Sequence, residues 1–191
     1  MTDSRVQPRP GKRERLVASA AELIHRQGVE ATTLAEIAQA ADVPPGNVYY
    51  YFKTRDDLVR AVIDQRTESF RELLHSLEQQ PTPPARLKAL IRSWADAREL
   101  VAEHGCPMGT LCSELSKQDD GLAREAAEVL ALPIDWAQAQ FREMGHNDAR
   151  ELATTLLAGV QGATLLANTF HDPQIMTHQT RRLEHWIDTL A

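Results

Sequence analysis

The sequence predicts an all-α protein of about nine helices. Apolar residues recur at helical spacing along most of the 191 residues, and the alternating or β-branched runs typical of strands are few. Apolar residues make up 42% of the chain and charged residues 25%, which is typical of a folded globular protein rather than a disordered one. Helices are expected over residues 12–27, 34–41, 45–51, 54–80, 85–103, 108–118, 121–144, 148–170 and 174–190.

Local signals set the first three helices. The helical pattern over 12–27 ends at Gly28. Thr33 and Glu36 have the spacing of a capping box at the start of the second helix. The segment Asp42-Val-Pro-Pro-Gly46 predicts a turn followed by a proline-led helix start. Helices this short are not stable alone, so they must share a core. Three of them joined by tight turns predict a helix-turn-helix unit.

The third helix carries all three tyrosines of the chain. Val48 and Phe52 lie one turn apart and are expected to face the core. That orientation directs Tyr49 and Tyr50 outward and leaves Tyr51 nearer the core side. The alternative is that the tyrosines simply pack the small domain, and their spacing alone does not separate the two interpretations.

The outward face has the chemistry of a DNA-contacting surface. Tyrosine hydroxyls can reach phosphate oxygens, and the amide of Asn47 can hydrogen-bond adenine at two points. Gly46 has no side chain where the backbone would approach a base edge. Thr54 is expected to cap the helix that follows, which has acidic residues in its first turn.

Charge is distributed unevenly along the chain, whose net charge is −6. Residues 1–60 hold 9 basic and 8 acidic side chains, whereas residues 61–191 hold 12 basic and 19 acidic ones. The N-terminal third is therefore the part that can meet phosphate without strong repulsion. A weakly basic, solvated tail is the alternative interpretation, so charge permits DNA binding without establishing it.

A wider set of residues carries a family resemblance. Ala31-Thr-Thr33, Ile37-Ala38, Ala41-Asp-Val43, Gly46-Asn-Val-Tyr-Tyr-Tyr-Phe52 and Arg55-Asp-Asp-Leu58 together resemble the N-terminal domain of the TetR family of bacterial transcriptional regulators. The resemblance is dense over residues 12–60, and beyond it the chain is similar to the family only in helix number and length. It implies a DNA-binding domain with a basic arm over 1–55 and an effector-binding and dimerisation domain over 56–191.

The resemblance also implies which residues contact an operator, the double-stranded DNA site of such a regulator. They are Thr33, Pro45, Gly46, Asn47, Tyr49, Tyr50, Tyr51, Lys53 and Arg55. Family members commonly have Gly at position 42, Ser or Thr at 44 and Lys at 45, where this chain has Asp42, Pro44 and Pro45. Asp tolerates the left-handed backbone that the turn needs. The two prolines offer no polar cap, so fewer base contacts and more reading of DNA shape are expected.

In the second domain, the resemblance implies a homodimer formed through the helices over 148–170 and 174–190, with an ordinary intrachain core as the alternative. A small-molecule effector of unknown identity is expected to release a repressor from DNA. Its binding residues are expected to be Trp94, Met108, Leu111, Cys112, Trp136 and Phe141, each of which could equally be plain core. The acidic balance of this region disfavours an anionic effector.

Two cysteines leave other functions open. Pro107 is expected at the first position of its helix with Cys106 as the cap, where a thiol becomes more reactive. A thiol-sensing regulator using Cys106 or Cys112 is one alternative, and two small buried side chains are the other. A cysteine-dependent enzyme using Cys106 or Cys112 with His104 is a further interpretation. A helical interaction module with a vestigial helix-turn-helix is another. No nucleophile triad, metal-ligand spacing, cofactor motif, secretory leader or membrane-length apolar run is found, so a cytoplasmic protein without enzymatic activity, metal or cofactor is expected.

Overall fold

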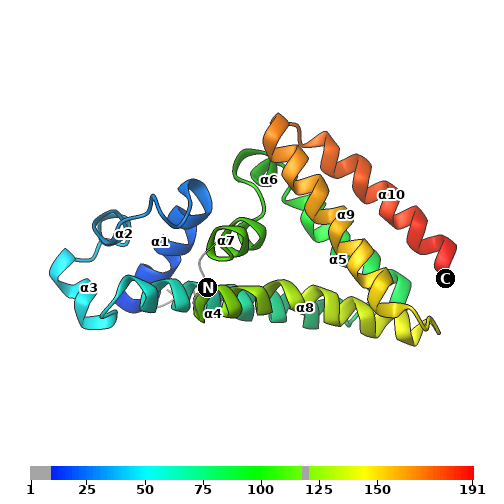
Figure 1. The fold of residues 1–191 in the computed structure, drawn as a ribbon, viewed down its shortest axis with the longest axis horizontal. Helices are drawn as coiled ribbons and strands as arrows, with labels where there is room; N and C mark the ends of the chain where they lie inside the picture. The colour runs from blue at the N-terminus through cyan, green and yellow to red at the C-terminus, as the bar shows by residue number, and fades with distance from the viewer. Residues whose placement is uncertain (1–9, 118–120) are drawn as a thin grey trace, which may run out of the picture. The chain divides into compact units, whose positions relative to one another are not determined.

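The computed structural model describes residues 10–117 and 121–191, which form α-helices joined by short connections (Figure 1). Arg5 and Arg9 of the expected basic arm lie outside the described residues. The helices within the described ranges are α1 (Lys12–Gln27), α2 (Leu34–Ala40), α3 (Pro45–Tyr51), α4 (Arg55–Leu77), α5 (Pro83–Asp96), α6 (Arg98–His104), α7 (Pro107–Leu115), α8 (Gly121–Glu143), α9 (Ala149–Phe170) and α10 (Gln174–Leu190).

The predicted all-α class is confirmed, with one difference in the division into helices. The single helix expected over 85–103 is two helices, α5 and α6, which meet at Ala97. The backbone of Ala97 has φ −91° and ψ 11°, and its N–H bonds to the carbonyl of Ala95. No glycine or proline marks this break, because tertiary packing produces it: α6 packs against α9, and Asn168 donates a hydrogen bond to the Ala102 carbonyl.

The chain divides into two compact units, residues 1–62 and 63–191. In the first unit, α1 packs on α2 and α2 packs on α3. Their apolar faces are joined in one core by the first two turns of α4. The buried side chains of this core include Leu16, Ala20, Ile24, Ile37, Ala38, Val48, Phe52, Leu58 and Val62.

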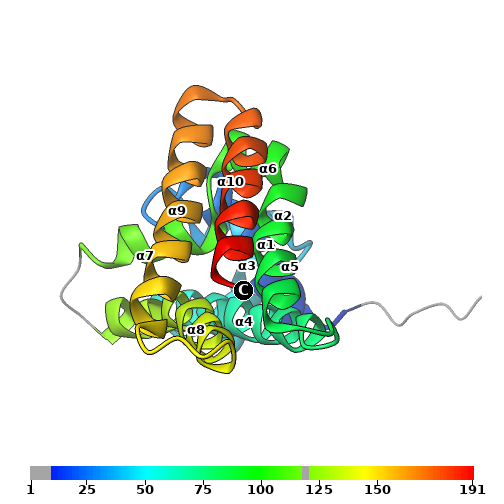
Figure 2. The same ribbon diagram turned by 90° about the vertical axis from the view of Figure 1, so that its right-hand side faces the viewer.

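The second unit is built around α9 and α10, which lie side by side in both views (Figures 1 and 2). Helix α5 packs along α10, and α8 packs along α9, with α7 against α8. Polar pairs tie the helices together at the edge of the core. Lys88 and Arg92 of α5 pair with Asp188 and Glu184 of α10. Within residues 10–117 and 121–191, no helix has the length and apolar character needed to cross a membrane.

Candidate nucleic-acid interface

The start of α2 is held by the expected capping box. The Thr33 hydroxyl accepts a hydrogen bond of 3.2 Å from the Glu36 N–H, and the Glu36 carboxylate accepts one of 2.9 Å from the Thr33 N–H. The Thr33 hydroxyl, which donates to the Glu36 carboxylate at 2.7 Å, and the Thr33 N–H lower the pKa of Glu36 below its usual value. Thr33 therefore fixes where α2 begins, and its side chain lies at the exposed end of the helix.

The turn between α2 and α3 depends on Asp42. This residue has φ 52°, the left-handed conformation that the sequence predicted. The next N–H, that of Val43, bonds to the Ala38 carbonyl at 3.0 Å and closes the turn. Arg15 of α1 braces it, because its Nε lies 2.9 Å from the Ala41 carbonyl oxygen and its Nη2 lies 3.1 Å from that of Asp42. This role of Arg15 has no signal in the sequence, since nothing local links position 15 to a turn 26 residues later.

Helix α3 begins at two prolines. Pro44 is the N-cap and Pro45 the first helical residue, with the Asn47 N–H bonded to the Pro44 carbonyl at 2.8 Å. Gly46 is exposed, and a Cβ built on it would have no atom within 4 Å. The side chain of Asn47 is half-buried. The first turn of α3 is therefore open toward solvent, with no neighbouring side chain against its glycine.

The two faces of α3 differ as predicted. Val48 and Phe52 are buried, whereas Tyr49 and Tyr50 are 59% and 77% exposed. Tyr51 is half-buried, and its ring meets that of Tyr50 edge to face at a centroid distance of 5.0 Å. This contact limits the motion of Tyr50 without covering it. Two adjacent aromatic side chains thus lie on the surface of a seven-residue helix.

Basic side chains surround the end of α3. Lys53 Nζ donates to the Tyr49 carbonyl at 3.0 Å, where it meets the negative end of the helix. Arg55 donates to the Val29 carbonyl, so part of its guanidinium serves the fold. The Arg13 guanidinium lies 5.3 Å from the centre of the Phe52 ring. The expected Thr54 cap is also present, because the Thr54 hydroxyl accepts a hydrogen bond of 3.1 Å from the Asp57 N–H. The Thr54 N–H donates to the Asp57 carboxylate at 3.0 Å, and this bond lowers the pKa of Asp57.

The residues expected to bind an effector are in the packed second unit. Trp94, Met108, Leu111, Cys112 and Phe141 are buried there. Trp136 is half-buried, and its indole Nε1 is buried without a hydrogen-bond partner. A cavity of about 10 Å³ is lined by Trp94 together with side chains of α8 and α9, which leaves room for no ligand. Whether the six residues bind an effector stays a prediction.

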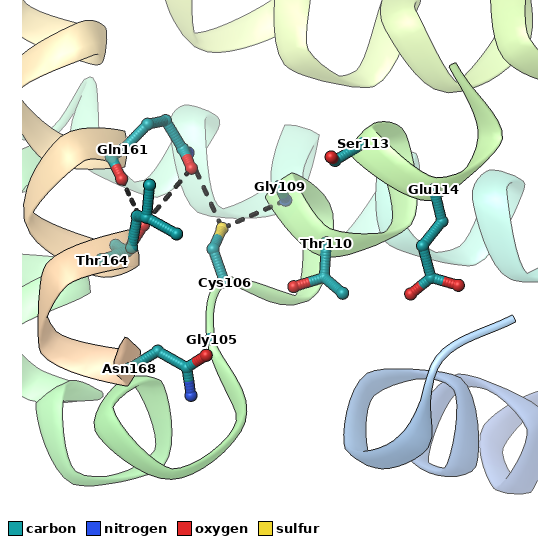
Figure 3. Close-up of a pocket in the computed structure, with 10 residues that line it drawn as sticks. Gly105, Cys106, Gly109, Thr110, Ser113, Glu114, Gln161, Thr164 and Asn168 are labelled. Atoms are coloured by element: carbon teal, nitrogen blue, oxygen red, sulfur yellow. Dashed lines mark hydrogen bonds between the residues drawn. The ribbon is translucent and has the colours of Figure 1, made fainter. Parts of the chain in front are cut away.

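A larger cavity, of about 310 Å³, lies between α7 and α9 (Figure 3). None of the six expected residues lines it, and of the residues that the sequence analysis discussed only Cys106 does so prominently. Gln161, Thr164 and Asn168 of α9 were missed, because in the sequence they read as the polar side of an apolar helix. The glycines at 105 and 109 that flank the proline were the available signal.

The two cysteines occupy different environments. Cys106 is the N-cap of α7, as predicted, and its Sγ accepts a hydrogen bond of 3.3 Å from the Gly109 N–H. Cys112 Sγ donates to the Ala126 carbonyl at 3.0 Å, and burial raises the pKa of its thiol to about 11. Both thiols are free. Among the described residues, no group of three or more His, Cys, Asp and Glu side chains is placed to hold a metal ion.

Apolar side chains are also exposed on the last turns of α9. Leu165, Leu166 and Phe170 are 67%, 47% and 66% exposed. Single exposed apolar residues are ordinary, but three within six positions of one helix are characteristic of a surface that another molecule covers.

Comparison with known proteins gives one consistent answer. Residues 16–62 match the domain of "Bacterial regulatory proteins, tetR family", and residues 83–182 match "Transcriptional regulator LmrA/YxaF-like, C-terminal domain". The chain is 29% identical to an HTH-type transcriptional regulator of Mycobacterium tuberculosis over 90% of this chain and 93% of that protein. It is 25% identical to the regulator LmrA of Bacillus subtilis over 87% and 91% of the two chains. A TetR transcriptional regulator from Legionella pneumophila has the same fold, with TM-score 0.84 and 21% identity over 96% and 98% of the chains.

Proposed function

The chain belongs to the tetR family of bacterial regulatory proteins, and from that premise we propose that α3 is its DNA-recognition helix. Proteins of this family are transcriptional regulators rather than enzymes. They bind DNA operators as dimers and respond to small molecules. In this chain, α3 and the residues next to it supply the contacts with DNA, and the second unit supplies the dimer and the effector response.

The observation that carries the proposal is the exposure of Tyr49 and Tyr50 on α3. The opposite face of the helix, with Val48 and Phe52, anchors it in the core of the first unit. The exposed face can therefore enter a major groove without disturbing the fold. The phenolic hydroxyls reach phosphate oxygens, and Asn47 at the start of the helix reads a base edge.

The other predicted contacts have supporting roles. Gly46 has no side chain and Pro45 has a compact one, so the backbone at the start of α3 can approach the bases closely. Lys53 carries three N–H donors, of which one bonds to the Tyr49 carbonyl, so two are left for phosphate. Arg55 bonds to the Val29 carbonyl and has further guanidinium donors that can meet phosphate from the same position.

Thr33 and Tyr51 complete the proposed contact set. Thr33 lies at the N-terminus of α2, where the helix dipole favours a phosphate. Its hydroxyl already bonds to Glu36, so we expect the backbone end of α2 rather than this hydroxyl to make the stronger contact. Tyr51 holds the ring of Tyr50 edge to face and acts on DNA through it.

We propose that α9 and α10 form the dimer. Two recognition helices must lie about 34 Å apart to enter successive major grooves, which a single chain with one such helix cannot achieve. The exposed Leu165, Leu166 and Phe170 supply an apolar surface on α9 for the partner. A small molecule bound in the second unit acts as effector by preferring the dimer geometry that does not fit the operator. Such a ligand releases the protein from its operator, and the protein therefore acts as a repressor.

Selection of bound duplexes from a random-sequence DNA pool tests the assignment. We expect a palindromic site whose two half-sites lie one helical turn apart, because a two-fold symmetric dimer reads two equivalent half-sites. The variant Asn47→Ala is expected to enrich the same spacing with a relaxed base preference in each half-site. A pool that enriches no common sequence, or an asymmetric single half-site, contradicts the proposal.

A further inference from the structure

We infer that the cavity between the start of α7 and the second half of α9 is a binding site for a compact, uncharged molecule that carries hydroxyl or amide groups. The inference rests on the proposed function, since it names the site and the class of the effector. The cavity is partly open to solvent and has a volume of about 310 Å³, at the lower end of the range of ligand sites and roughly ten times the volume of a water molecule in the liquid.

Five neutral hydrogen-bonding side chains line the cavity. Thr110 and Ser113 come from α7, and Gln161, Thr164 and Asn168 come from α9 (Figure 3). Hydroxyl and amide groups both donate and accept hydrogen bonds, so they complement a ligand with the same groups. Most of the exposed area of the cavity is apolar, as in an ordinary ligand pocket, and these polar groups are the ones that would orient a ligand.

The lining of the cavity carries little charge. Glu114 is the single charged residue among those that line it. Arg66 of α4 does not line the cavity, but its positive charge interacts with Cys106 at the wall, and burial lowers the pKa of its guanidinium. Among the lining side chains an anion finds no cationic partner and a cation finds Glu114 alone, so a charged ligand would lose most of its hydration without equivalent compensation.

The N-terminus of α7 does not make the cavity an anion site. Pro107 has no N–H, and the N–H of Gly109 already bonds to Cys106 Sγ at 3.3 Å. The N–H of Thr110 bonds to the Cys106 carbonyl at 2.9 Å. Few of the donors that normally attract an anion to a helix start are therefore free at this helix.

Two glycines shape the wall. A Cβ on Gly109 would lie 2.7 Å from Gln161 Oε1 and 3.3 Å from Cys106 Cβ. Gly105 has φ 78°, and a Cβ there would lie 3.1 Å from Thr110 Oγ1. The Gln161 amide therefore fits against bare backbone and lies 3.7 Å from Cys106 Sγ through its Nε2. A methyl group at position 109 moves that amide and alters the cavity while leaving the core intact.

Leu165 connects the cavity to the proposed dimer surface. It lines the cavity and is 67% exposed on α9, next to Leu166. A ligand in the cavity thus lies against a residue of the surface through which we propose that the two copies pair. This contact gives the ligand a direct route to the dimer geometry.

Cys106 provides a built-in reporter of the cavity. Iodoacetamide and iodoacetate alkylate a thiolate by the same displacement: sulfur bonds to the methylene carbon, iodide leaves and the thiol proton goes to solvent. The first reagent is neutral and the second anionic. Both thiols are buried, but Cys106 lines the cavity and the pKa of Cys112 is raised to about 11, so we expect iodoacetamide to modify native Cys106 roughly tenfold or more faster than Cys112. At Cys106, the alkylation rate with iodoacetamide divided by the rate with iodoacetate should exceed the same ratio measured for N-acetylcysteine.

Protection by added compounds tests the ligand class. We expect erythritol or nicotinamide, which are small and uncharged, to slow Cys106 alkylation, and succinate and putrescine to leave it unchanged. Gly109→Ala and Gln161→Leu should abolish the protection. Gly121→Ala is the matched control, since a Cβ there comes no closer than 3.9 Å to another side chain.

The opposite results overturn the inference. Equal alkylation of the two cysteines means that the cavity does not admit small molecules. Protection by succinate or putrescine, or by none of the four compounds, contradicts the uncharged hydroxyl or amide class. DNA binding by the same preparation is measured in parallel. If DNA binding is intact but the expected alkylation or protection pattern is absent, the result contradicts this inference and leaves the proposed function standing.

Discussion

Arg15 Nη2 lies 3.1 Å from the carbonyl oxygen of Asp42, the residue with φ 52° at the turn between α2 and α3. The same guanidinium bonds to the Ala41 carbonyl at 2.9 Å. An arginine of the first helix therefore fixes the turn from which α3, the proposed recognition helix, departs. The orientation of α3, and with it the direction of Tyr49, depends on a residue of α1.

Removing this brace should affect stability and DNA binding together. Arg15→Ala is expected to destabilise the protein by about 1.5–3 kcal/mol, the range for hydrogen bonds to charged groups. Arg15→Lys keeps the charge but cannot reach both carbonyls in the same way, and should recover less than half of the loss. Urea unfolding and operator affinity measure the two effects. Full recovery by lysine would show that charge alone matters at this position.

Asp42 should tolerate glycine and reject a β-branched residue. The left-handed backbone costs Val or Ile more than Asp, and costs Gly least. Asp42→Gly is expected to leave the unfolding midpoint unchanged or raised, and Asp42→Val to lower it by the equivalent of about 1–2 kcal/mol. Thermal unfolding checks this order. A valine variant as stable as the glycine variant would contradict the role assigned to the turn.

The exposed apolar residues of α9 should control the oligomeric state. Leu166→Glu combined with Phe170→Glu places charges on the proposed dimer surface and is expected to give monomers. Leu100→Glu is the matched control, because Leu100 is also an exposed leucine but belongs to α6. Sedimentation equilibrium separates the outcomes. A dimer that survives the double substitution places the interface elsewhere.

Cys112 should give an alkaline limit to stability. Burial raises the pKa of its thiol from 9.0 to about 11, so the folded state keeps a proton that the unfolded state loses. Stability is then fully present below pH 9 and declines as the pH rises from 9 toward 11. Cys112→Ala removes this dependence at the cost of some packing. An unchanged alkaline slope in Cys112→Ala would assign it to other groups.

Sequence alone predicted much of the first unit, because its signals are local. The Thr33–Glu36 capping box, the left-handed Asp42, the proline-led start of α3 and the outward Tyr49 and Tyr50 each follow from a few neighbouring residues. The break at Ala97 was missed, since it results from packing between helices and has no glycine or proline. The brace at Arg15 was missed for the same kind of reason.

The second unit was harder to predict in detail. Trp94 and Phe141 looked like pocket residues because they are large and apolar, but they are equally good core residues and are buried. The cavity that the structure contains is lined instead by Thr110, Gln161 and Asn168. Its position depends on where two distant segments meet, and beyond the glycines at 105 and 109 the sequence carries no signal of that meeting.

DNA binding by the exposed face of α3 is the proposal on which the other functional assignments depend. Its most direct test is fluorescence anisotropy on the selected duplex, over a series of salt concentrations, for the wild type, Tyr49→Ala, Tyr50→Ala and Lys53→Ala. We predict a loss of about tenfold or more for each tyrosine variant with an unchanged unfolding midpoint, and a salt slope lower by about 1 for Lys53→Ala. Wild-type affinity in both tyrosine variants would contradict the assignment of α3 as the recognition helix.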